Sequence, residues 1–201
     1  SMYNDRVKFK TLAFQAKKEY QKTKDPKTAK EISRCHNIQW AKKIALNSAY
    51  GAIGNQYFRY YDKAIAEGIT KSGQLSIRWI EKKLNKYLNN VLKTDDDYVI
   101  ASDTDSVYLT MDKLVTETIK SDNALSKTIN FLDKVASESI EPYITKSYDE
   151  LKQYTNAYAN KMFMKREVIA DKGIWVAKKR YILNVWDSEG VSYKEAKLKM
   201  M

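Results

Sequence analysis

The chain has 201 residues, of which 43% are hydrophobic and 30% are charged, and these ordinary globular values exclude a disordered tail or a collagen-like chain. One cysteine, Cys35, and one histidine, His36, leave no internal disulfide, no zinc site and no Ser-His-Asp triad. No apolar run of about 18 residues is present, so we expect a protein without a membrane span that stays inside the cell.

The formal charge is +11, and the positive charge is concentrated at the start of the chain. The first fifty residues hold twelve Lys and Arg against four Asp and Glu. A positive field of this density suits a polyanion such as nucleic acid or nucleotide phosphate. The alternative is a solvated helical face.

The first part of the chain is predicted to form two antiparallel helices. In residues 3–24, which contain no Gly or Pro, apolar side chains recur three and four apart: Phe9, Leu12, Ala13 and Ala16. Asp25 before Pro26 is typical of an N-cap followed by Pro at the first helical position, so a second helix is expected over residues 27–51.

A third, amphipathic helix is predicted over residues 64–92. Its apolar face is formed by Ile69, Gly73, Ile77, Ile80, Leu84 and Leu88. Gly73 is expected to permit a close helix contact, and the acidic residues 95–97 are expected to end the helix as a turn.

Strands and a further helix are predicted in the rest of the chain. Residues 98–101 and 107–110 are β-rich runs around a hairpin turn, and four more runs lie at 162–170, 174–177, 181–186 and 191–193, with turns at 171–173 and 187–190. Between the runs at 107–110 and 162–170, the sequence shows a helical pattern that is interrupted at Pro142. The apolar residues of this pattern are Leu125, Ile129, Leu132, Ala136, Ile140, Ile144, Tyr148 and Leu151. The predicted fold class is α+β: a helical hairpin followed by helices packed on a partial antiparallel or mixed β-sheet.

Polar side chains share one face of the second predicted helix. Lys43, Asn47, Tyr50 and Gly54 follow one another at helical spacing. That face could hold a phosphate, orient a sugar or base, and lay an aromatic ring beside a base pair. The alternative is an ordinary packed helix with Tyr50 in the core and Lys43 in solvent. On the first helix, Arg6 and Lys10 could add a second phosphate clamp.

Two carboxylates, Asp103 and Asp105, lie one residue apart in the first hairpin turn. Such a pair can aim at one point, as a hard divalent cation with oxygen ligands requires. The alternative is that Asp, Thr and Ser simply favour turns.

These residues resemble three successive motifs of the family B DNA polymerases. The motifs are KIALNSAYG at residues 43–51, SDTDS at 102–106 and KKRY at 178–181. Smaller matches resemble the tailed-phage replicative branch in particular: GN at 54–55, FRYYD at 58–62, MFM at 162–164 and LNVWD at 183–187.

The resemblance implies a template-directed DNA polymerase that uses two Mg²⁺ ions. Residues 1–61 would form the fingers hairpin and residues 62–201 a partial palm. Lys43 would contact the incoming triphosphate, Asn47 would help to hold it, and Tyr50 would lie against the nascent base pair. By a looser match, Arg6 and Lys10 become triphosphate ligands as well.

The resemblance also implies roles for residues of the palm. Asp105 would be the metal ligand of its motif with Asp103 beside it, and the two form the catalytic pair. The primer strand near its 3′ end would be held by Lys178, Lys179, Arg180 and Tyr181.

The sequence departs from the family pattern in two places. Ala101 stands where an aromatic residue is usual, so packing under the carboxylate turn is expected to differ. Lys165 stands where relatives often carry an acid, and the nearby Glu167 matches an acid to which the resemblance assigns no role. Asp187 and Glu189 have the D-x-E form of a proofreading exonuclease motif, but the flanking strands favour a hairpin turn.

Nothing matches the earlier palm motif with the other carboxylate, the exonuclease domain or the thumb. We therefore expect a polymerase fragment that is inactive alone, with primer–template DNA, deoxynucleoside triphosphate (dNTP) and the missing polymerase segments as partners. An open sheet edge is expected to allow self-association. If the source is viral, the location is the cytoplasm of the infected host. The alternative function is a noncatalytic basic DNA-binding module.

Overall fold

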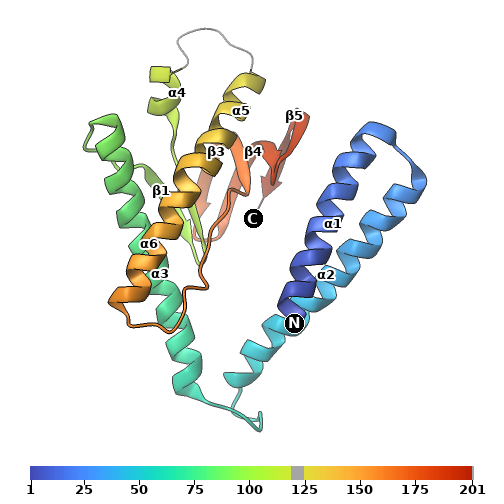
Figure 1. The fold of residues 1–201 in the computed structure, drawn as a ribbon, viewed down its shortest axis with the longest axis vertical. Helices are drawn as coiled ribbons and strands as arrows, with labels where there is room; N and C mark the ends of the chain where they lie inside the picture. The colour runs from blue at the N-terminus through green and yellow to red at the C-terminus, as the bar shows by residue number, and fades with distance from the viewer. Residues whose placement is uncertain (119–124, 201) are drawn as a thin grey trace. The chain divides into compact units, whose positions relative to one another are not determined.

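The computed structural model describes residues 1–118 and 125–200, and the chain divides into two compact units, Ser1–Lys71 and Ser72–Met201. Figure 1 shows the elements in chain order. The boundary between the units falls inside helix α3, Lys63–Leu92, whereas the predicted domain boundary precedes that helix. The division into fingers and palm therefore stays a prediction.

The first unit contains the predicted helical hairpin. Helix α1 spans Met2–Thr23 and helix α2 spans Pro26–Ile53, an antiparallel pair in Figure 1. Lys24 adopts the left-handed conformation, with φ 52°, and ends α1. As predicted, the Asp25 side chain caps α2 by accepting a hydrogen bond from the Lys27 N–H at 3.1 Å, with Pro26 in the first turn. The buried side chains of the two helices are small: Ala13, Ala16 and Cys35.

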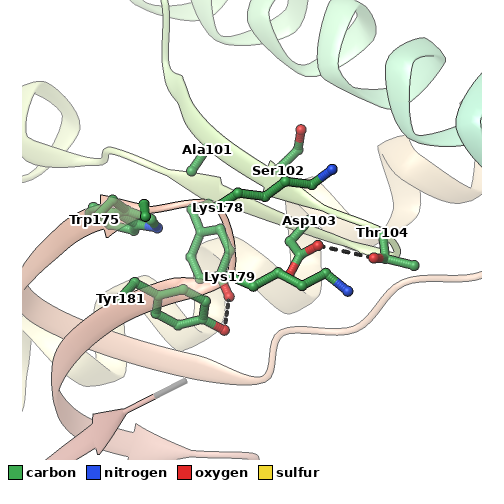
Figure 2. Close-up of a pocket in the computed structure, with 10 residues that line it drawn as sticks. Ala101, Ser102, Asp103, Thr104, Trp175, Lys178, Lys179 and Tyr181 are labelled. Carbon is green, nitrogen blue, oxygen red and sulfur yellow. Dashed lines mark hydrogen bonds between the residues drawn. The ribbon is translucent and has the colours of Figure 1, made fainter.

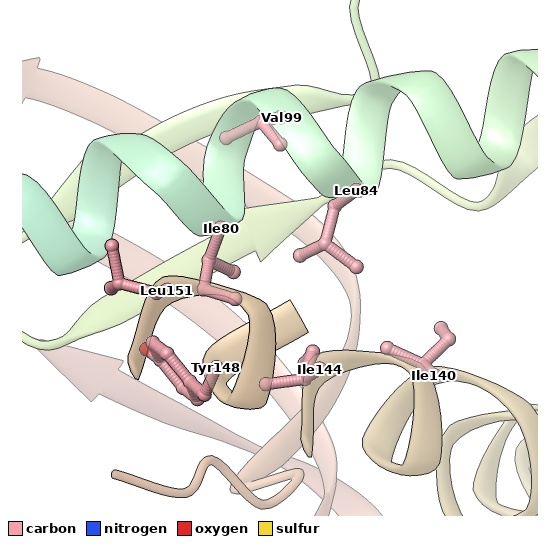
Figure 3. Packing of buried hydrophobic residues seen from close by; sticks show 7 residues of the cluster. All are labelled: Ile80, Leu84, Val99, Ile140, Ile144, Tyr148 and Leu151. Carbon is pink, nitrogen blue, oxygen red and sulfur yellow. The ribbon is translucent and has the colours of Figure 1, made fainter. Parts of the chain in front are cut away.

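The main hydrophobic core of the second unit lies between α3 and the helices that follow the first hairpin. These are α5, Leu125–Val135, a turn of π-helix, Ala136–Ile140, and α6, Glu141–Tyr154, with Pro142 in its first turn. The pattern break predicted at Pro142 is thus a π-helical turn just before it. The buried cluster in Figure 3 consists of Ile80, Leu84, Val99, Ile140, Ile144, Tyr148 and Leu151.

The predicted apolar face of α3 is correct only for its later turns. Ile80 and Leu84 are fully buried and Leu88 nearly so, but Ile69 is 49% exposed. A Cβ on Gly73 would meet no described atom within 4 Å, so the predicted close helix contact there is wrong. The core begins instead at Ser76, which is buried and donates its hydroxyl to the Ser72 carbonyl at 2.7 Å.

The strands form two separate antiparallel sheets rather than one, and no parallel pair occurs in the described part of the chain. The first sheet is the predicted hairpin of β1, Val99–Asp103, and β2, Ser106–Leu109. The second has the order β3, Val168–Ala177, β4, Arg180–Ser188, and β5, Val191–Met200. A short helix that the sequence did not suggest, α4, spans Asp112–Thr118.

The turn predicted at residues 171–173 is wrong, because β3 continues through it. Gly173 lies inside β3, where its lack of a side chain makes room for neighbouring side chains. A Cβ there would lie 2.6 Å from the Trp175 ring and 2.8 Å from a Leu183 methyl group, so only glycine lets these side chains pack so close to the strand. The real turn between β3 and β4 is formed by Lys178 and Lys179.

Arg166 fastens the second sheet to the helices. Its guanidinium donates to Asp187 on β4 and to Asp133 on α5, and its backbone N–H donates to the Glu141 carboxylate at 3.0 Å. Asp187 is buried and also accepts hydrogen bonds from the Ser192 hydroxyl and the Gly190 N–H. The D-x-E sequence is therefore part of a hairpin, as expected, and its first carboxylate is an anchor.

The environment of Asp187 favours its ionised form. Burial alone would raise the pKa of this carboxyl, but the hydrogen bonds from Ser192 and Arg166 and the attraction of the guanidinium outweigh burial and hold the pKa below its ordinary 3.8. A depressed native pKa contributes stability that is present above about pH 4 and is lost as the pH falls through the native value.

We expect Asp187→Asn to lower the free energy of unfolding at pH 7 by about 3 kcal/mol, because it breaks a buried ion pair. The variant should also lose less stability than the parent between pH 4 and pH 2, since it has no carboxylate to protonate at this position. Urea unfolding followed by circular dichroism measures both effects. Asp133→Asn, at the exposed partner of Arg166, is the control and should cost less than about 1 kcal/mol. Equal losses in the two variants would contradict the anchor role of Asp187.

Candidate functional site

The carboxylate turn joins β1 to β2. Asp103 ends β1, where it pairs with Ser106, and Thr104 adopts φ 54° in the turn. The Thr104 hydroxyl donates to the Asp103 carboxylate at 3.0 Å, and the Asp105 N–H donates to the Asp103 carbonyl at 2.6 Å. Asp103 is half-buried and Asp105 is exposed. The turn therefore places two carboxylates at one end of the hairpin.

A hollow of about 450 Å³ lies between this hairpin and the β3–β4 hairpin. Its lining residues, shown in Figure 2, are Ala101, Ser102, Asp103, Thr104, Tyr108, Trp175, Ala177, Lys178, Lys179 and Tyr181. Two of the three motifs singled out in the sequence, 75 residues apart between Asp103 and Lys178, thus meet at one place. Asp105 and Arg180 adjoin the hollow in sequence but do not line it.

The basic side of the hollow is the turn between β3 and β4. Lys178 and Lys179 are exposed, and Lys179 has φ 60°. In Figure 2 both lysine side chains extend toward the carboxylate turn. A phosphate in the hollow would meet two ammonium groups, and a cation would meet the Asp103 carboxylate.

Tyr181 is a buried residue that lines the hollow. Only 5% of its surface is exposed, and its hydroxyl accepts a hydrogen bond from the Tyr108 hydroxyl at 2.5 Å. Burial and the negative charges of Asp103 and Glu167 raise the pKa of Tyr181 far above its ordinary value. The phenol therefore stays protonated and keeps a hydrogen to donate.

Of the two positions at which the sequence departs from the family pattern, Ala101 lies in this site. Ala101 lines the hollow and faces Tyr108 across the strand pair, so an aromatic ring reaches the hollow from β2. Glu167 precedes β3, and its carbonyl accepts from the Glu189 N–H at 2.6 Å. Its charge acts on Tyr181, as described above. Lys165 is exposed.

The other predicted ligands lie in the first unit. Lys43 is half-buried, with its ammonium 5.1 Å from the centre of the Trp40 ring, and Asn47 is exposed. Tyr50 is 44% exposed, and its hydroxyl shares a hydrogen bond of 2.8 Å with Thr70 on α3. The alternative in which Tyr50 is a core residue of a packed helix is therefore wrong.

The N-terminal turn of α1 contacts α2. An ion pair of 3.5 Å joins Asp5 on α1 to Lys42 on α2. The Arg6 Nε is buried and has no hydrogen-bond partner within the described ranges. Lys10, one turn further along, lies 5.6 Å from the centre of the Phe14 ring.

The donor set fits a weakly held hard cation. Asp103 and Asp105 offer carboxylate oxygens from one turn, but nowhere in residues 1–118 and 125–200 do three or more His, Cys, Asp or Glu side chains gather as a metal site would require. Mg²⁺ tolerates such a set because it keeps several waters and takes further ligands from substrate phosphates.

Within residues 1–118 and 125–200, no helix has the length and apolar character that a membrane crossing needs.

Comparison with known proteins gives one consistent result. The model of DNA polymerase family B matches residues 11–141, a range that includes the α2 motif and the carboxylate turn but not the Lys178–Lys179 turn. The chain is 45% identical over 170 residues to the DNA-directed DNA polymerase of Escherichia phage RB69, covering 80% of this chain and 19% of that protein. It is 43% identical over 185 residues to that of Enterobacteria phage T4, covering 86% and 20%. The chain thus spans about a fifth of the length of these relatives.

Proposed function

The chain belongs to DNA polymerase family B, and on this premise we propose that it supplies part of the site at which a DNA polymerase adds nucleotides to a primer. The observation that carries the proposal is the hollow that joins Asp103 to the Lys178–Lys179 turn. Nucleotidyl transfer needs both a carboxylate-bound cation and a grip on phosphate, and this hollow offers residues for each.

Asp105 and Asp103 are the residues that would hold Mg²⁺. In a complete site, two such ions would supply activation of the primer 3′-hydroxyl and stabilisation of the pyrophosphate leaving group. The Thr104 hydroxyl orients the Asp103 carboxylate, and the exposure of Asp105 leaves its carboxylate accessible to a cation that arrives with its triphosphate.

In this proposal residues 1–61 are the fingers and bind dNTP. Lys43 contacts the triphosphate, Asn47 helps to hold it, and the exposed ring of Tyr50 lies against the nascent base pair. The Tyr50 hydroxyl is held by Thr70, so the ring has a fixed orientation. Arg6 and Lys10 add positive charge from α1.

Residues 62–201 form a partial palm in the same proposal. Lys178, Lys179 and Arg180 hold the backbone of the primer near its 3′ end, and Tyr181 donates its hydroxyl to the same strand. The partners are primer–template DNA, dNTP and further polymerase segments that bring the remaining carboxylate. The chain alone does not polymerise, and if its source is viral it acts in the cytoplasm of the infected host cell. Strand β5 lies at the edge of its sheet, and pairing of this edge with a second copy of the chain would explain any self-association.

The alternative is a noncatalytic module whose basic surface grips DNA. Both functions need the lysines, but only nucleotidyl transfer needs the carboxylate turn to hold a cation. Metal binding at this turn therefore discriminates between them.

We expect the chain to bind one Mn²⁺ loosely, used as a spectroscopic substitute for Mg²⁺, and the double variant Asp103→Asn, Asp105→Asn to bind it at least tenfold more weakly. Paramagnetic resonance of free Mn²⁺ measures the affinity. The double variant Asp95→Asn, Asp97→Asn changes two carboxylates of the loop between α3 and β1 in the same unit and is the matched control. Identical binding by the carboxylate-turn variant and the parent would favour the noncatalytic module.

Lys43→Ala should weaken dNTP binding roughly tenfold or more, because a charge-assisted contact to phosphate contributes about 1.5–3 kcal/mol. Lys42→Ala removes the same charge from the preceding residue, whose side chain points about 100° away on the helix and pairs with Asp5. It should have the smaller effect in a dNTP titration at identical salt. Equal losses in the two variants would mean that bulk charge, and not the α2 face, binds the nucleotide.

A further inference from the structure

We propose that Tyr108 is a positioning residue, which holds Tyr181 and thereby fixes the Lys178–Lys179 turn at a set distance from the carboxylate turn. The inference rests on the proposed function, because the spacing of the two turns matters only if the hollow between them receives nucleic-acid phosphate. None of the polymerase motifs in the sequence includes Tyr108.

Each of the two tyrosines lies beside a functional turn on its own hairpin. Tyr108 on β2 faces Ala101, two residues before Asp103 on β1. Tyr181 is the second residue of β4, two residues after Lys179. The hydrogen bond of 2.5 Å between their hydroxyls therefore joins the sheet with the carboxylates to the sheet with the basic turn.

Ring packing makes this joint stiff. Trp175, opposite Tyr181 on β3, contacts the Tyr108 ring edge to face at 5.6 Å between centroids and stacks on Tyr181 at 6.3 Å. The two tyrosine rings are 5.3 Å apart in a T-shaped contact. Gly173 allows the indole to lie close to β3. Three mutually packed rings leave the hairpins little freedom to slide or rotate against each other.

The hydrogen bond also directs the Tyr181 proton. Tyr108 donates to the Tyr181 oxygen, so the hydrogen of Tyr181 points elsewhere, and Tyr181 lines the hollow. A phenol that accepts one hydrogen bond becomes a stronger donor for another. Tyr108 therefore orients a neutral donor toward a phosphate oxygen while the two lysines supply the charge.

The test is Tyr108→Phe, which removes the hydroxyl and keeps the ring. The matched control is Tyr98→Phe, because Tyr98 is also buried in the second unit and its hydroxyl bonds Thr94 at 2.7 Å away from the hollow. Fluorescence anisotropy gives the affinity of each protein for a labelled primer–template duplex over a salt series. Urea unfolding gives the stability of each protein.

If the parent neutralises about four to six phosphates, log K falls with log salt at a slope of roughly −4 to −5. We expect Tyr108→Phe to make the slope shallower by about 1 and to weaken binding at low salt roughly tenfold. Tyr98→Phe should keep the parental slope and affinity although it also loses a hydroxyl hydrogen bond. Tyr108→Phe with the parental slope and affinity would overturn the inference.

A double-mutant cycle separates positioning from general damage. If Tyr108 acts through Tyr181, the variant carrying both Tyr108→Phe and Tyr181→Phe binds DNA no more weakly than Tyr181→Phe alone. Additive losses would overturn the inference while leaving the proposed function intact. Salt-independent binding by the parent, or none at low salt, would instead count against the proposed function itself.

Discussion

The site depends on a side-chain contact between two small sheets that share no backbone hydrogen bonds. One sheet ends in the carboxylate turn and the other in the basic turn, and the hollow exists only while both are held in place. The rings of Tyr108, Trp175 and Tyr181 make that contact at the near end of the second sheet. At its far end, the buried pair of Arg166 and Asp187 fastens the same sheet to α5. Two different interactions thus secure opposite ends of one three-stranded sheet.

The chemistry follows from the charges that these contacts bring together. The carboxylate turn lies beside two lysines, so a cation bound by the aspartates would be repelled by the lysine ammonium groups. A phosphate placed between them resolves the conflict, since it attracts both the cation and the lysines. The proposed function therefore predicts a site that binds metal weakly alone and more tightly when nucleotide and DNA phosphates are present.

The sequence predicted those parts of the fold that local patterns determine. Asp25 and Pro26 locate the break in the helical hairpin, and the β-rich runs around SDTDS define the first hairpin. The errors concern contacts between distant residues. Gly173 looked like a turn because nothing local shows that Trp175 and Leu183 will cover it. Ile69 fits the helical period of α3, but whether a neighbour covers that turn is a tertiary property.

The residues of the candidate site divide in the same way, into those that local motifs identify and those that depend on contacts between distant residues. The motif residues could be named from the sequence, and the structure brings Asp103, Lys178, Lys179 and Tyr181 to one hollow. Tyr108 and Trp175 could not be named, because a tyrosine in a strand reads as an ordinary β-former and its partner lies 73 residues away. The aromatic joint is visible only when both sheets are seen together.

Primer extension tests the central claim, that Asp105 and Asp103 supply metal-binding carboxylates for nucleotidyl transfer, most directly. The assay compares this chain alone, the chain with an added N-terminal segment from a related family B polymerase, and the same mixture with Asp105→Asn. The account predicts no extension by the chain alone, measurable extension with the added segment, and loss of that extension in the variant. Robust extension by the chain alone that persists in Asp105→Asn would contradict it.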